Sequence, residues 1–205
     1  MSAFSCLEIL KSHAKALVRT QGIKLHIAQE QIAKQANFSD FHDLTTVARR
    51  DPMESRLVAA ALGNADLADA LYEDPAYTQL NIALEEKLSG WMAETNAENF
   101  TMEDIEVTAT DYDAATGVLT LDVSFTYQGE LDPDRGYTAS AFFMDARFRL
   151  KRRAGEWLLA EDGIAILASE TDQDRDWYEQ GGMEELAFDP DREYDLFEEP
   201  DDDAL

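Results

Sequence analysis

The 205-residue chain contains one cysteine, Cys6, and no long apolar run. One thiol cannot build an internal disulfide framework, and a lack of disulfides is typical of a reducing compartment, so the sequence predicts a cytoplasmic protein. No apolar stretch approaches the roughly 18 residues that a membrane-spanning helix needs, so we expect no membrane association. The first residues also lack the basic start and apolar stretch of a secretory signal.

Basic residues are scarce, with 17 Lys and Arg against 43 Asp and Glu and a net charge of −26. Such a field repels nucleic acid and anionic membranes and favours a basic partner, although a solvated acidic surface without any partner explains the same composition. The charge is uneven. Residues 1–51 hold seven basic and five acidic side chains, whereas the remainder holds 10 and 38. The sequence therefore predicts a mildly basic N-terminal part on a strongly acidic body.

Motifs for cofactors, metals and covalent catalysis are also lacking. There is no glycine-rich phosphate loop and no nucleophile elbow. The alternating carboxylates of residues 172–176 are similar to the start of a calcium loop, but Trp177 stands where that loop needs glycine and Met183 where it needs glutamate. The three histidines do not form a zinc-binding pattern. We therefore expect no cofactor, no metal and no catalytic residue.

Residues 1–72 are predicted to form a helical N-terminal part. Apolar residues recur at helical spacing, Ser39 is an expected N-cap, and Asp51 followed by Pro52 predicts a further helix start. Gly22 and Gly63 are expected helix ends. The expected helices cover residues 5–20, 26–36, a segment after Ser39, 51–62 and 64–72.

Phe38, Phe41 and Leu44 follow a pattern that resembles a short helical module of plasmid- and phage-borne proteins, over about residues 23–50. Residues 28–50 also resemble a helix-turn-helix, although Asp40 and Asp43 would face phosphates poorly. That resemblance implies weak DNA binding by residues 1–51, and three small helices that only pack together are the alternative. The basic residues expected to contact phosphates are Lys11, Lys15, Arg19, Lys24 and Lys34.

Residues 75–168 are predicted to form a long helix packed on an antiparallel sheet, so the expected fold class is α+β. Apolar and polar residues alternate over 118–127 and 141–150, which indicates strands with one buried face. Shorter runs at 105–109 and 156–159 extend this to a meander of about four strands. By the same alternation Asp122 and Asp145 fall on the wet face, where pairing with arginine is expected rather than catalysis.

The run from Arg153 to Leu159, Arg-Ala-Gly-Glu-Trp-Leu-Leu, follows the predicted helix and meander. Over about residues 75–167 this order is similar to the cystatin-like and NTF2-like folds. The resemblance implies a curved sheet that wraps a helix. Proteins of this kind include both small-molecule enzymes and binding modules, so it leaves the function open.

Residues 169–205 are predicted to form an acidic tail that contains aromatic residues. From residue 170 onward there are 16 acidic residues and two arginines, interleaved with aromatic side chains. This mixture is typical of a segment that docks on a surface rather than of a purely solvated tail. The predicted partner-binding residues are Asp172, Asp174, Asp176, Trp177, Tyr178, Glu184, Glu185 and Phe188.

Three functions follow from these features. The first hypothesis is a non-enzymatic acidic protein, encoded by a mobile element, that binds a basic nucleic-acid-handling protein and inhibits it as a nucleic-acid mimic. The second is a transcriptional or plasmid regulator with a weakly DNA-binding helical head. The third is a small-molecule enzyme of the NTF2-like kind, which would require a pocket with convergent polar residues.

Overall fold

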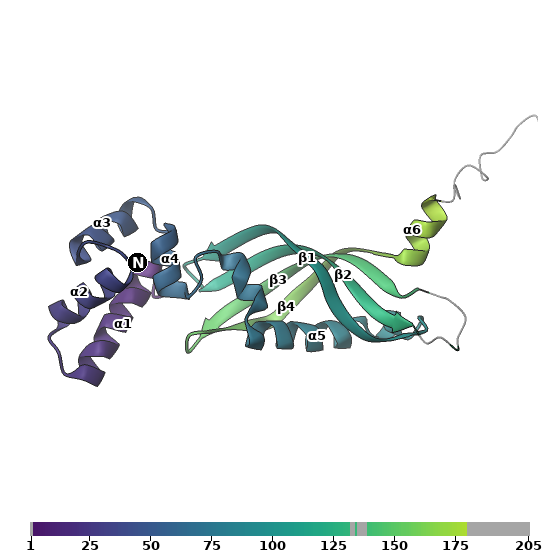
Figure 1. The fold of residues 1–205 in the computed structure, drawn as a ribbon, viewed down its shortest axis with the longest axis horizontal. Helices are drawn as coiled ribbons and strands as arrows, with labels where there is room; N and C mark the ends of the chain where they lie inside the picture. The colour runs from purple at the N-terminus through teal and green to yellow at the C-terminus, as the bar shows by residue number, and fades with distance from the viewer. Residues whose placement is uncertain (1, 132–133, 135–138, 180–205) are drawn as a thin grey trace, which may run out of the picture.

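The fold is α+β, as the sequence predicts, and a computed structural model describes residues 2–131, 134 and 139–179. Figure 1 shows a helical head at one end and a long helix lying along a sheet. The helices are α1 (Cys6–Gln21), α2 (Leu25–Gln35), α3 (Phe41–Arg50), α4 (Ser55–Leu62), the 3₁₀ helix η1 (Leu67–Tyr72), α5 (Asp74–Met92) and α6 (Asp172–Glu179). The strands are β1 (Ala97–Asp113), β2 (Val118–Leu131), β3 (Ala141–Arg153) and β4 (Glu156–Thr171).

In the helical head, α1 to α4, two helix boundaries differ from the prediction. Asp40 rather than Ser39 caps α3, because its carboxylate accepts a hydrogen bond from the Asp43 backbone N–H at 2.7 Å. Asp51 ends α3 instead of starting α4, since its own backbone N–H donates to the Val47 carbonyl. Glu54 caps α4, where its carboxylate accepts from the N–H of Leu57.

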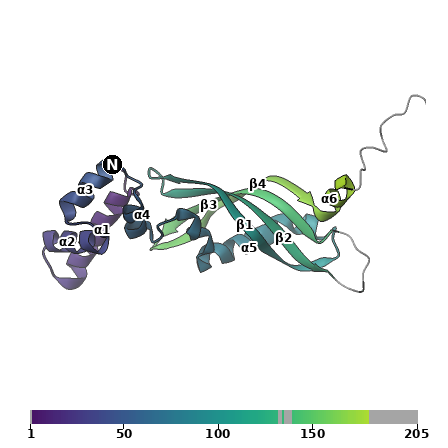
Figure 2. The same cartoon turned by 45° about the horizontal axis from the view of Figure 1, so that its top comes forward.

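The sheet is an antiparallel meander in the order β1-β2-β3-β4. Its central pair is regular, with Asp122 opposite Arg147 and Ser124 opposite Asp145. The edge strands are longer than predicted and irregular. In β1 the pairing shifts between Glu103 and Glu106, which is a β-bulge. Figure 2 shows the twist that carries the sheet across α5.

One face of the sheet, here called the inner face, packs against α5. Leu80 and Leu84 of α5 are fully buried, as are Leu121 of β2, Phe148 of β3 and Trp157 of β4. The predicted apolar stripes of the helix and the strands therefore meet, and their side chains fill the space between the two layers. Burial raises the pKa of the neighbouring Tyr127 on this face to about 12. The opposite face, here called the outer face, carries the polar residues of each strand.

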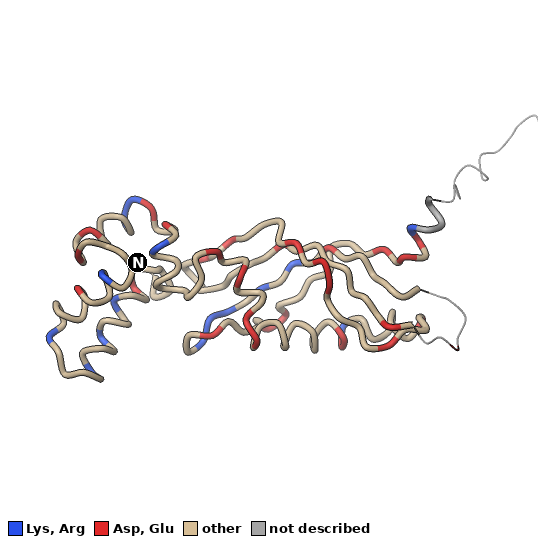
Figure 3. Tube along the Cα trace, viewed as in Figure 1, with Lys and Arg blue, Asp and Glu red and all other residues tan. Residues whose placement is uncertain are grey.

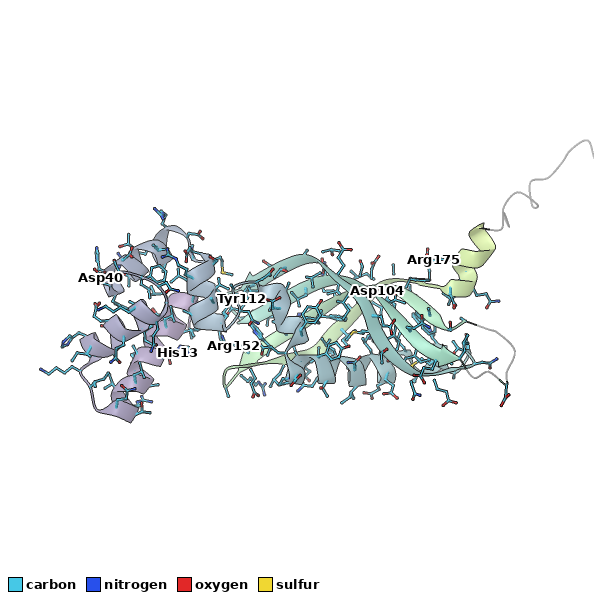
Figure 4. All side chains as sticks on the ribbon, viewed as in Figure 1. His13, Asp40, Asp104, Tyr112, Arg152 and Arg175 are labelled. Atoms are coloured by element: carbon cyan, nitrogen blue, oxygen red, sulfur yellow. The ribbon has the colours of Figure 1, made fainter. Side chains whose placement is uncertain are left out.

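The helical head joins the sheet at the β1–β2 turn and the β3–β4 hairpin. The Tyr112 hydroxyl donates to the Phe4 carbonyl at 2.8 Å, and Arg152 Nη1 donates to the Ala61 carbonyl at 2.5 Å. The Arg152 guanidinium also lies 5.9 Å from the Trp157 ring centroid. Figure 4 shows Tyr112 and Arg152 together at this junction. The hydrogen bonds link both ends of the head sequence to the sheet.

Within the described ranges, we found no helix with the length and apolar character that crossing a bilayer requires.

Candidate functional site

The outer face of the sheet separates charges along β3. Every second residue of this strand points outward, and these residues change from Phe143 and Asp145 near α6 to Arg147, Arg149 and Lys151 near the head. Figure 3 shows the blue segments of β3 in the half of the sheet nearer the head. The acidic and basic halves are therefore distinct surfaces, and each contains a groove.

The acidic half contains a groove of about 300 Å³, here called the outer groove. Its floor includes Ser124 and Phe143, and four carboxylates surround it. Glu106 and Asp145 face each other across β2, where the Ser124 hydroxyl donates to Asp145 at 2.6 Å. The four carboxylates are those of Asp104, Glu106, Asp145 and Glu170.

Asp104 owes its position to the bulge in β1. Its φ of 48° is left-handed, which costs a residue with a side chain about 1 kcal/mol and which aspartate tolerates better than most. In the described part of the chain, the carboxylates of Glu103, Asp104 and Glu106 accept no hydrogen bond and form no ion pair. Three unpaired negative charges within four residues repel one another, so a cation placed among them is favoured.

One arginine of the chain already lies in this groove. Arg175 extends from α6, and its guanidinium carbon lies 3.4 Å from the centroid of the Phe143 ring. Its Nε also lies 3.3 Å from a carboxylate oxygen of Glu170. Figure 4 labels Arg175 and Asp104 at this end of the molecule. The groove can thus hold a guanidinium group between an aromatic face and a carboxylate.

A second groove, of about 340 Å³ and here called the end groove, opens between the end of α5 and the end of β4. Trp91 and Phe142 line it, with their ring centroids 6.4 Å apart. Trp91 is 43% exposed, whereas Leu88, about one turn earlier in α5, is buried. Ser169 and Glu170 line both grooves, so the two adjoin at the end of β4. The other acidic residues of the end groove are Glu94 and Asp174.

The structure gives Asp172 and Asp174, two of the predicted partner-binding residues, roles within the chain. A carboxylate oxygen of Asp172 accepts hydrogen bonds from the Ser140 N–H at 3.0 Å and from its hydroxyl at 2.9 Å. Asp174 accepts from the N–H and the hydroxyl of Thr171 at 3.0 and 2.8 Å, and the backbone bond is the larger cause of its lowered pKa. Both carboxylates anchor α6 to the sheet, and partner binding by them stays a prediction.

The other predicted tail residues are not placed by the described side chains. Asp176, Trp177 and Tyr178 belong to α6, but their side chains lie outside the described part of the protein, as do residues Glu184, Glu185 and Phe188 altogether. The two grooves were not predicted from the sequence. A usable signal was present in β1, because the segment Ala97–Asp113 contains six acidic residues and no basic one.

The basic half of the outer face holds a larger groove, of about 600 Å³. Arg147 forms a two-pronged ion pair with Asp122, at 2.7 and 2.9 Å, which confirms the predicted arginine pairing for this aspartate. The same prediction for Asp145 is wrong, because Asp145 lies opposite Ser124 and accepts a hydrogen bond from its hydroxyl. Arg147 is the largest cause of the lowered pKa of Asp122. Arg149 also lines the groove, but its side chain forms no ion pair or hydrogen bond within the described ranges.

The titratable groups at the junction of the head and the sheet have pKa values set mainly by burial. Burial raises the pKa of the Cys6 thiol, lowers that of His13 and raises that of Tyr112 to about 12. A thiol with a raised pKa is a weak nucleophile at neutral pH. Among the described residues, no three His, Cys, Asp or Glu side chains converge in an arrangement that could hold a metal ion.

The helical head exposes the lysines that a DNA-binding reading requires, but two of its features act against that reading. Lys11 lies 2.7 Å from a Glu8 carboxylate oxygen. Asp40 and Asp43 stand at the start of α3, the helix that would enter a DNA groove. DNA binding by the head therefore stays a prediction.

Comparisons of the chain with protein-family models, with curated proteins and with solved structures gave no match. The resemblance to cystatin-like and NTF2-like folds therefore stays a prediction from the order of the elements.

Proposed function

We propose that the protein binds a basic protein partner through the outer and end grooves and catalyses no reaction. The observation that carries this proposal is the Arg175 contact, in which a guanidinium stacks on Phe143 and pairs with Glu170. An arginine of a partner would find two further carboxylates beside this contact, because Asp104 and Glu106 line the same groove without a partner of their own in the described part of the chain.

The exposed aromatic ring of Trp91 adds a second kind of contact. Interfaces obtain most of their binding energy from a few aromatic and arginine contacts, whereas charges at the rim mainly set association rate and specificity. Trp91 lies in the end groove beside Phe142, next to the shared Glu170. A partner segment that presents an arginine and an apolar side chain would therefore engage both grooves at once.

If the proposal is right, the affinity for a cationic peptide depends more on the charges that line the outer groove than on the net charge of the protein. In a double variant, Asp104→Asn with Glu106→Gln, two exposed ion pairs worth about 0.7 kcal/mol each are lost, which weakens binding about tenfold. The measurement is the fluorescence anisotropy of a labelled oligoarginine peptide titrated with the protein at about 50 mM and about 500 mM salt, which bracket weak and strong screening. We expect affinity to fall with salt for the wild type.

The matched control is Glu85→Gln with Glu86→Gln, which removes the same two charges from the exposed side of α5. It is expected to change the dissociation constant less than about twofold, within the range for remote surface charges. Equal weakening by the two double variants would mean that the peptide responds to net charge alone, and the groove proposal would be wrong.

We further propose that the natural partner handles nucleic acid and that the protein acts on it in the cytoplasm, as a mimic that occupies the partner's basic surface. A basic groove that neutralises phosphates also accepts ordered carboxylates. Baits of wild type and of the groove double variant would isolate the partner. Competition with duplex DNA for the isolated partner would then test mimicry, and simultaneous binding of both would contradict it.

A further inference from the structure

The outer face carries a surface that the proposed function does not use. Four cations occupy alternate positions of β3, and they are here called the basic stripe: Arg147, Arg149, Lys151 and Arg153. Successive members are about 6.6 Å apart along the strand. Of the four cations of the stripe, only Arg147 has an ion-pair partner among the described residues. A row of cations on a chain with a net charge of −26 is expected to attract an anionic group.

We propose that the basic stripe is the docking surface for the acidic C-terminal segment of the same chain, residues 180–205. This segment contains 11 acidic residues and one arginine, so its charge is complementary to the stripe. A separate polyanion such as nucleic acid would have to approach against the net negative field of the whole protein. The C-terminal segment is already attached, so its high local concentration offsets the repulsion that a separate polyanion would meet in full.

The distances allow this contact. Asp172, at the start of α6, bonds to Ser140. The stripe begins seven residues further along β3 and extends to Arg153, so it lies roughly 23 to 43 Å from Ser140. A flexible segment as long as 180–205 has a typical end-to-end distance of about 28 Å and a fully extended reach of about 85 Å. Attachment at α6 also gives the segment an effective concentration in the millimolar range at the stripe. Weak individual ion pairs are then enough to keep it bound.

Lys151 allows a direct test in the full chain. A carbodiimide joins an amine to a carboxylate only when the two groups are in contact, and Lys151 is the one lysine of the stripe. We expect peptides that link Lys151 to residues 180–205 to dominate the products identified by mass spectrometry. The comparison site is Lys87, which is exposed on α5 and away from the outer face. Lys87 is expected to give at least fivefold fewer links to that segment.

Variants separate a specific contact from general attraction. Arg149→Glu is expected to reduce the Lys151 links at least fivefold, whereas Arg149→Lys retains them. Arg19→Glu makes the same charge change in the exposed part of the head and leaves the links unchanged. Far-ultraviolet circular dichroism checks that each variant is folded. Mixing unlabelled with ¹⁵N-labelled protein shows whether the links lie within one chain, and links mainly between chains would overturn the proposal.

Two further results would overturn it. The first is an even distribution of links over all lysines, because the stripe would then have no preference for the segment. The second is the absence of Lys151 links combined with protection of Lys151 from acetylation by a short DNA duplex, which would make nucleic acid the occupant. Neither result bears on the outer and end grooves, since their proposed function is tested with a cationic peptide and different variants.

Discussion

The two faces of the sheet are built from the same four strands, yet they hold different kinds of interaction. On the inner face Leu121, Phe148 and Trp157 are fully buried against α5 and the head. On the outer face the best-formed ion pair, Asp122 with Arg147, has side chains that are 30% and 48% exposed. Burial contributes far more free energy than exposed ion pairs do. The inner face therefore supplies most of the stability, and the charges of the outer face can change with little effect on folding.

The largest expected effect is on the inner face. Trp157→Ala should lower the free energy of unfolding by about 3–5 kcal/mol, because it leaves a cavity in a filled layer. Trp157→Phe should cost about 1 kcal/mol, since it retains most ring contacts and removes the buried Nε1–H, which has no acceptor among the described residues. Urea unfolding followed by circular dichroism measures both. Equal losses for the two variants would show that the indole nitrogen matters more than the volume.

An intermediate effect is expected where the head meets the sheet. Arg152→Ala removes the hydrogen bonds to the Ala61 and Gly155 carbonyls and should cost about 2 kcal/mol. The adjacent Arg153→Ala lies on the exposed outer side and should cost less than about 0.5 kcal/mol. The readout is the urea midpoint together with limited proteolysis between η1 and α5. If the two variants lose the same stability, then Arg152 does not hold the head to the sheet.

The smallest effect is expected on the outer face. Asp122→Asn breaks the exposed pair with Arg147 and should move the urea midpoint less than either inner-face change, with a difference that shrinks as salt is added. Asp122→Asn in an Arg147→Gln background should have no additional effect, which is the control. A shift as large as that of Trp157→Ala would remove the distinction between the two faces.

The regular parts of the fold could be predicted because local pattern and burial agree there. Alternation in β2 and β3 identified the inner residues Leu121 and Phe148, and the wet-face aspartate Asp122 was placed correctly beside an arginine. The long helix α5 was equally clear from its leucine stripe. In these segments each residue's side follows from a period of two or 3.6, so no tertiary information is needed.

The groove residues could not be predicted by the same reasoning. Asp104 reaches the outer groove because β1 bulges, and a bulge breaks the alternation from which a face is assigned. Arg175 reaches it from α6, a helix whose position depends on the hydrogen bond between Asp172 and Ser140. Asp51 shows the same limit in the head, since one aspartate beside a proline can end one helix or start the next. These placements depend on contacts between segments far apart in the sequence.

The open meander has a consequence for behaviour in concentrated solution. Among the residues that the structure describes, its first and last strands each have one row of backbone groups without a neighbouring strand. Such edges can pair with a second chain that extends the sheet. Here β1 holds six acidic residues and β4 holds four, with no basic residue in either strand. Two copies that approach edge to edge would bring like charges together along their whole length. The acidic residues of the two edge strands therefore also oppose edge-to-edge association of copies of this chain into fibrils.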